Sequence, residues 1–170
     1  GGRAASLVDV DVGNAHWKGD DKAGRGGSRR VGLSAALERS GAGRCAHVWR
    51  VFEEATPSAL SRRLGSYILT ETMEGRPDIG LDSYDRLFPN QDTMPQGGFG
   101  NLIALPLQKE PRRQSNSVFL DYNLEPWADQ WAVRARVRKI GQAQVEGTVQ
   151  DAERRGRRRR GGLPPQVCGA

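Results

Sequence analysis

The feature that most constrains the fold is a short alternation of apolar and acidic residues near the start of the chain. Residues 5–12 read Ala-Ser-Leu-Val-Asp-Val-Asp-Val. Successive side chains of a strand point to opposite faces of a sheet. The three valines therefore point into a core, while Asp9 and Asp11 share the other face with Leu7. This alternation predicts a strand in a sheet that is buried on one face.

The two carboxylates of this strand are a candidate metal site. Asp9 and Asp11 lie side by side and repel each other, and a hard divalent cation removes that repulsion by using oxygens of both. Magnesium and manganese sites of phosphoryl-transfer enzymes are built in this way. The alternative is an exposed strand face that carries two solvated aspartates.

Hydrophobic periodicity, together with Gly and Pro, predicts the remaining elements. Strands are expected at residues 44–52, 101–107 and 117–122, helices at 57–73 and 142–155, and irregular chain at 13–32 and 78–101. Strands and helices interleave without a regular β-α-β alternation, which favours an α+β fold. The length of 170 residues suits one domain, which we place at residues 1–155.

The positive charge of the chain is concentrated near its end. Lysine and arginine number 26 against 20 acidic residues, and residues 154–160 hold six of the arginines, so the rest of the chain is formally neutral. An arginine run of this kind binds the phosphates of nucleic acid. The alternative is a solvated, flexible segment. We expect residues 156–170 to form a basic, disordered tail that contains Gly and Pro.

Several classes of protein are excluded by what the sequence lacks. No apolar run approaches the roughly 18–20 residues of a membrane span, and we expect no signal peptide. The two cysteines, Cys45 and Cys168, are too few for a zinc site of their own. A reduced, cytoplasmic protein that does not bind membranes is the prediction.

A glycine-rich turn precedes a candidate strand with a histidine. Residues 40–49 read Ser-Gly-Ala-Gly-Arg-Cys-Ala-His-Val-Trp. Backbone N–H groups of such turns bind phosphate, and His47 at the start of the strand is placed to bind phosphate or to orient a nucleotide. The alternative is a histidine with an ordinary hydrogen bond. A nucleophilic pair of Cys45 and His47 is disfavoured, since positions two apart on one strand give poor geometry for it.

The long central segment supplies further carboxylates. Asp82, Asp85 and Asp92 precede the glycines of residues 97–100 and a short apolar run. A third carboxylate from this segment would complete a site for two metal ions, and the glycines would let the backbone approach a nucleotide. The alternative is a long surface loop, although loops of this length in a small domain are usually functional.

These motifs carry a resemblance to a known family. The segments concerned are Leu81-Asp-Ser-Tyr-Asp-Arg-Leu-Phe-Pro-Asn-Gln-Asp92, Gly97-Gly-Phe-Gly-Asn-Leu-Ile-Ala-Leu-Pro-Leu107 and Asp129-Gln-Trp131. Over residues 5–155 the chain resembles the archaeo-eukaryotic primase domain of TOTE conflict systems. Those bacterial proteins join a primase-polymerase to a helicase and often to a nuclease. The resemblance implies an RRM-like antiparallel sheet flanked by helices, with a second small α/β unit.

The resemblance also implies roles for individual residues. Asp9 and Asp11 match the family's Asp-x-Asp strand, and His47 matches its histidine, with Cys45 in the small-residue position two before it. The third metal aspartate is Asp92, which we favour, or its rival Asp85. In this reading His47, Gly43 and Arg44 bind the nucleotide. Arg86, Asn90 and Asn101 are further candidates for contact with template or triphosphate.

The function implied is that of a DNA primase or polymerase. Three carboxylates would hold two Mg²⁺ or Mn²⁺ ions, which bind a nucleoside triphosphate and activate a 3′-hydroxyl for nucleotidyl transfer. The expected partners are a DNA or RNA template and primer, nucleoside triphosphates, and helicase and nuclease domains of a parent protein. The alternative is a catalytically inactive remnant that still binds nucleic acid.

Overall fold

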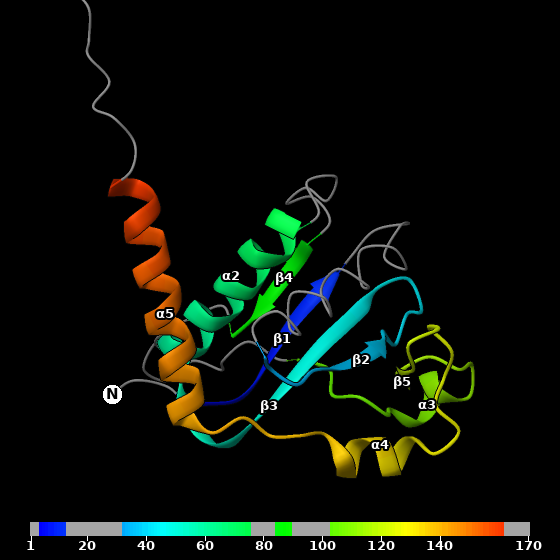
Figure 1. The fold of residues 1–170 in the computed structure, drawn as a ribbon. Helices are drawn as coiled ribbons and strands as arrows, with labels where there is room; N and C mark the ends of the chain where they lie inside the picture. The colour runs from blue at the N-terminus through cyan, green and yellow to red at the C-terminus, as the bar shows by residue number, and fades with distance from the viewer. Residues whose placement is uncertain (1–3, 13–31, 76–83, 90–102, 162–170) are drawn as a thin grey trace, which may run out of the picture.

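The computed structural model describes residues 4–12, 32–75, 84–89 and 103–161 of the chain. Strands and helices are mixed along the sequence, as an α+β fold requires (Figure 1). Their bounds are β1 (Ala4–Val12), β2 (Ala36–Arg39), β3 (Ala46–Pro57), α2 (Ser58–Gly75), β4 (Tyr84–Phe88), α3 (Lys109–Arg112), β5 (Val118–Leu120), α4 (Gln130–Arg136) and α5 (Gln142–Gly161).

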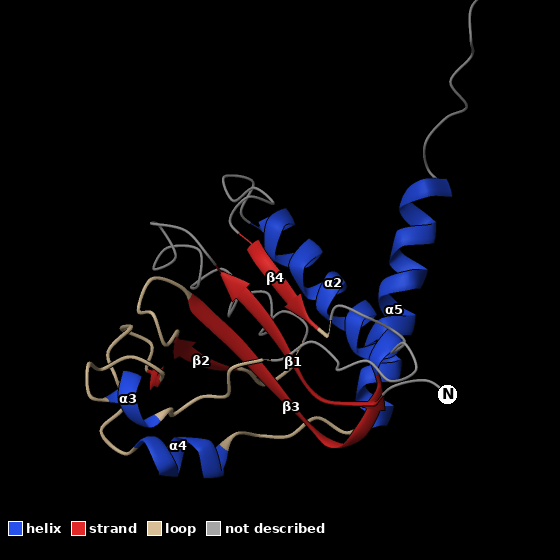
Figure 2. Ribbon diagram, turned by 180° about the vertical axis from the view of Figure 1, so that it is seen from behind, coloured by secondary structure: helices blue, strands red, loops and turns tan. Residues whose placement is uncertain are grey.

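The strands form one sheet in the order β4-β1-β3-β2-β5, and every neighbouring pair is antiparallel. The long strand β3 lies at the centre, between β1 and β2. Figure 2 shows β3 crossing the whole domain, with the short strand β2 beside it. The sheet therefore joins segments from the beginning, middle and later parts of the chain.

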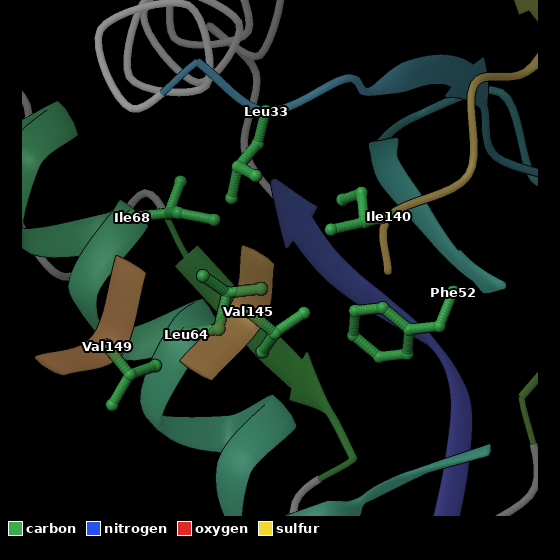
Figure 3. Packing of buried hydrophobic residues seen from close by; sticks show 7 residues of the cluster. All are labelled: Leu33, Phe52, Leu64, Ile68, Ile140, Val145 and Val149. Carbon is green, nitrogen blue, oxygen red and sulfur yellow. The ribbon is translucent and has the colours of Figure 1, made fainter. Parts of the chain in front are cut away.

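Helices α2 and α5 pack together beside one face of the sheet (Figure 1). The apolar residues of α2 recur every four positions, at Leu60, Leu64 and Ile68, and so form one stripe along the helix. This stripe meets Phe52 of β3 and the buried valines of α5. Figure 3 shows the cluster that results, which consists of Leu33, Phe52, Leu64, Ile68, Ile140, Val145 and Val149.

A smaller cluster lies on the opposite face of the sheet. Trp49 of β3 and Phe119 of β5 pack there with Leu107, and Val133 of α4 lies against them. Residues 46, 48 and 52 of β3 belong to the clusters on the α2 side, whereas Trp49 belongs to this one, as the alternation of a strand requires. Helix α4 thus covers the β5 side of the face that Trp49 occupies.

Most elements with a clear periodicity lie where the sequence predicted them. The strand at 5–12, the helix at 57–73, the strand at 117–122 and the helix at 142–155 correspond to β1, α2, β5 and α5. The strand predicted at 44–52 is β3, which continues to Pro57.

Other expectations were wrong. Residues 84–88 form strand β4 inside a segment predicted to be irregular, because pairing with β1 stabilises a short strand that has no clear pattern of its own. The strand predicted at 101–107 is absent from its described part, 103–107. Leu107 has φ 67°, which is incompatible with a strand, and Pro106 before it has no N–H to donate to a neighbour.

The C-terminal helix also extends beyond its predicted end. Helix α5 continues to Gly161, so residues 156–161 are helical and not part of a disordered tail. Arginine is among the better helix formers, which explains how the helix continues through the arginine run. Residues 162–170, like 13–31, lie outside the described residues.

Candidate active site

The register of the sheet places three of the predicted residues, Asp11, His47 and Arg86, in one row. Asp11 of β1 pairs with His47 of β3, and His47 pairs in turn with Glu38 of β2. On its other side Asp11 pairs with Arg86 of β4. Directly paired positions of antiparallel strands lie on the same face of the sheet. Glu38, His47, Asp11 and Arg86 therefore occupy neighbouring positions across four strands.

A second row lies two residues along the strands. Asp9 pairs with Trp49 on β3 and with Phe88 on β4, and Trp49 pairs with Ala36 on β2. The two rows share one face, which is the face opposite to α2 and α5. The sequence predicted that Asp9 and Asp11 share a face. The pairing adds that His47 and Trp49 stand directly opposite them.

Glu38 is a residue of this face to which the sequence analysis gave no role. Its side chain is only 2% exposed, and its carboxylate accepts hydrogen bonds from Trp49 Nε1 at 2.6 Å and from Ser117 Oγ at 2.9 Å. A buried carboxylate is costly unless it is hydrogen-bonded, so these donors hold it in place. No local signal marks Glu38, because strand β2 has four residues and its burial depends on β3 and β5.

The ring of His47 packs against the indole of Trp49, which is hydrogen-bonded to Glu38. His47 is half-buried, and its ring centroid lies 5.9 Å from that of Trp49, with the two planes inclined by 44°. Tilted aromatic contacts at this distance are favourable. Glu38 holds the indole of Trp49 and Trp49 packs beside His47, so a buried carboxylate from the next strand supports one side of the His47 ring.

The glycine-rich turn before His47 is closed by Ser40. The N–H of Gly43 donates to the backbone oxygen of Ser40 at 2.9 Å, and the N–H of Cys45 donates to Ser40 Oγ at 3.2 Å. Gly43 has φ +74°, and a Cβ atom there would lie 2.7 Å from Asn116 Oδ1. Glycine is therefore required for the shape of the turn. Two of its N–H groups bind Ser40, while the side chain of Arg44 is exposed.

Strand β4 brings Asp85 to the neighbourhood of Asp11. Arg86 pairs with Asp11 and Tyr84 pairs with Val12, so Asp85 is an extra residue at a bulge between these two pairs. Bulges are common beside active sites, because they re-aim a side chain. The other candidates for the third carboxylate, Asp82 and Asp92, lie outside the described residues, as do Asn90 and Asn101.

The described side chains include no group of three or more His, Cys, Asp and Glu residues that could hold a metal ion. The carboxylates of β1 are not among those side chains. The chemistry of the residues nevertheless suits one kind of ion, because Asp9 and Asp11 occupy one face of the sheet and carboxylate oxygens are the hard ligands that Mg²⁺ and Mn²⁺ prefer.

Comparison with known proteins connects this face to a family. The profile of the "TOTE conflict system, Archaeo-Eukaryotic Primase domain" matches residues 3–148, which is most of the chain. The chain belongs to this family. It is one of the primase-like nucleotidyltransferase domains of a conflict system. A comparison with curated proteins finds no significant match.

The stretch matched to the TOTE primase domain contains the five strands of the described sheet and both rows of the candidate site. It ends within α5, before the arginine run of residues 154–160. The family assignment therefore rests on the sheet and not on the basic end of the chain. Within the described part of this primase domain, none of the helices is long and apolar enough to cross a membrane.

Proposed function

We propose that this TOTE primase domain transfers nucleotides from nucleoside triphosphates to the 3′-hydroxyl of a primer, or of a first nucleotide, on a DNA or RNA template. The observation that carries the proposal is the register that sets Asp11 directly opposite His47 and Asp9 opposite Trp49. Two carboxylate positions and a histidine position meet there on one face of a sheet. This is the combination that metal-assisted phosphoryl transfer uses.

In this proposal Asp9 and Asp11 hold Mg²⁺ or Mn²⁺ together with a third carboxylate. Bound divalent ions neutralise a triphosphate and increase the acidity of an attacking hydroxyl. Asp92 remains the favoured third ligand and Asp85 its rival. The bulge beside Asp11 supports Asp85, and parallel Asp85→Asn and Asp92→Asn variants decide between the two.

The positions beside the carboxylates suit the phosphates of the nucleotide. His47 and Arg86 flank Asp11 on either side, and Arg44 lies in the turn that precedes β3. These groups donate hydrogen bonds to phosphate oxygens and hold the triphosphate in place. Gly43 contributes the shape of the turn, because its N–H is bound to Ser40. Trp49, held by Glu38, keeps the imidazole of His47 in a fixed orientation.

The strand order also supports the RRM-like arrangement in the proposal. Strands β4, β1, β3 and β2 lie side by side in the order of a split β-α-β sheet, and each runs antiparallel to its neighbours. Strand β5 extends this sheet beyond β2. In the proposal the acidic face is open to nucleotide and template, while α2 and α5 cover the other face. Helicase and nuclease domains of a parent protein are proposed partners.

Primer extension tests the proposed activity. The purified chain is incubated with a labelled primer-template, nucleoside triphosphates and either Mg²⁺ or Mn²⁺. We expect extension by the parent and at least a hundredfold loss in an Asp9→Asn, Asp11→Asn double variant. Asp151→Asn, at an exposed site on α5, is the matched control and should retain full activity. Equal extension by parent and double variant would refute the metal site.

A second candidate function is a nucleic-acid-binding domain without catalysis. The observation in its favour is that the N–H groups of Gly43 and Cys45 both bind Ser40 and are not directed to a phosphate. A folded parent that binds a primer-template but extends it with neither metal ion would support this alternative.

A further inference from the structure

An exposed tryptophan on α4 lies close to two arginines. Trp131 is 55% exposed, although it is among the largest apolar side chains. The guanidinium carbon of Arg112, from α3, lies 5.4 Å from the centroid of its ring, and that of Arg134 lies 5.9 Å away. We refer to Trp131, Arg112 and Arg134 as the α3–α4 platform. It presents an aromatic surface and two positive charges to solvent.

The charge of the α3–α4 platform is not neutralised within the described part of the chain. Neither Arg112 nor Arg134 forms an ion pair with a carboxylate there, and each guanidinium group lies near the ring of Trp131. The neighbouring Arg113 differs, because its Nη1 lies 2.7 Å from Glu110 Oε2. Two guanidinium groups beside an indole are therefore available to an anionic ligand that also has a flat surface.

The α3–α4 platform adjoins the candidate active site on two sides. Pro111, next to Arg112, packs against Gly41 of the turn that precedes β3: a Cβ atom at Gly41 would lie 3.5 Å from Pro111 Cγ. On the other side, Val133 of α4 packs in the cluster that contains Trp49. Helices α3 and α4 lie near each other at the β2–β5 side of the sheet (Figure 2). A ligand on the platform would therefore lie on helices that contact the turn before β3 and the cluster around Trp49.

We propose that the α3–α4 platform binds a single-stranded segment of nucleic acid. A base would stack on the indole of Trp131, while Arg112 and Arg134 would contact the phosphates on either side of it. Stacking on an exposed aromatic residue combined with arginine contacts is how proteins bind single strands without reading their sequence. The inference rests on the proposed function, in which an unpaired template strand has to reach the acidic face.

Binding of labelled oligonucleotides tests the proposal directly. Fluorescence anisotropy is measured with the full chain and fluorescein-labelled oligo(dT) or oligo(U), so that the two arms separate DNA from RNA. We expect Trp131→Ala to weaken binding about tenfold, and Trp131→Phe, which retains an aromatic face, to weaken it by less than about threefold. Circular dichroism verifies that each variant is folded.

A matched pair of arginine variants separates the α3–α4 platform from a general effect of charge. Arg112→Ala and Arg113→Ala remove the same charge at adjacent positions of the chain, but only Arg112 contacts Trp131. We expect Arg112→Ala alone to weaken binding, by about fivefold. The binding constant falls as the salt concentration rises, and each phosphate contact to a single strand contributes about 0.7 to the steepness of log K against log salt concentration. An Arg112→Ala, Arg134→Ala double variant loses two such contacts, so the steepness should decrease by about 1.4.

The possible outcomes distinguish this proposal from the proposed function. Binding that depends on Trp131 in a chain without extension activity would support the platform and refute catalysis. Extension by the parent, with equal binding by Trp131→Ala and parent, would overturn the platform and leave the proposed function intact.

Discussion

Replacing Glu38 tests whether the buried carboxylate holds the active-site face together. Glu38→Ala removes the acceptor for two buried donors, Trp49 Nε1–H and Ser117 Oγ–H. An unsatisfied buried donor costs about 1–3 kcal/mol, so the two together amount to roughly 2–6 kcal/mol. Removing a buried charge recovers part of that cost. We therefore expect the free energy of unfolding to fall by about 3 kcal/mol.

The isosteric variant separates hydrogen bonding from packing. Glu38→Gln retains the volume of the side chain and one acceptor oxygen, and its amide group then faces the second donor. We expect a smaller loss, of about 1–2 kcal/mol. Trp49→Phe removes the indole N–H but leaves an aromatic ring beside His47. In a double-mutant cycle of Glu38→Gln with Trp49→Phe, the coupling should be at least about 1 kcal/mol, because the two side chains share one hydrogen bond.

Urea unfolding followed by far-ultraviolet circular dichroism gives these free energies. Ser66→Ala, at an exposed site of α2, is a control for substitution as such and should change stability by less than about 0.5 kcal/mol. A loss of less than about 1 kcal/mol in Glu38→Ala would show that the two hydrogen bonds to Glu38 do not stabilise this face. Effects of Glu38→Gln and Trp49→Phe that simply add would show that the two side chains are not coupled.

Two further predictions concern stability. Gly147→Ala, in an open position of α5, should stabilise the protein by about 0.5–1 kcal/mol, whereas Gly65→Ala, whose Cβ would lie 2.5 Å from Leu87 Cδ1, should destabilise it by about 1–3 kcal/mol; equal effects in urea unfolding would contradict this. Burial, and then the charge of Glu71, raise the pKa of Tyr67 above 10.0, so its contribution to stability is complete below pH 10 and is lost as the pH rises through the higher, folded-state pKa. Tyr67→Phe should therefore reduce the loss of stability above pH 10, and an unchanged pH profile would refute this assignment.

The elements that could be predicted from the sequence are those whose pattern is local. The alternation of residues 5–12 predicts β1 and the shared face of Asp9 and Asp11, because a strand has a period of two whatever it pairs with. The four-residue spacing of Leu60, Leu64 and Ile68 predicts α2 in the same way. The long central motif also allowed the family to be predicted, because a sequence motif is recognised from the order of its residues and requires no knowledge of their contacts.

Apart from β5, which lies within the strand predicted at residues 117–122, the short elements could not be predicted, because their stability comes from their neighbours. Strand β2 has four residues and β4 five, and helices α3 and α4 span about one and two turns. Periods of two or 3.6 residues cannot be recognised in so few positions. Helix α4 carries Trp131 of the α3–α4 platform, so the platform too could not be found from the sequence.

The sequence by itself determined that the chain forms an α+β domain with two adjacent carboxylates on a strand and a histidine after a glycine-rich turn. Only the tertiary structure decided that Asp11 stands opposite His47, and that Glu38 is buried beside Trp49. The physical reason is register. Strand β1 contacts residues more than thirty positions away, and a shift of one residue would have turned its aspartates to the other face. That register is selected by the packing of the whole sheet.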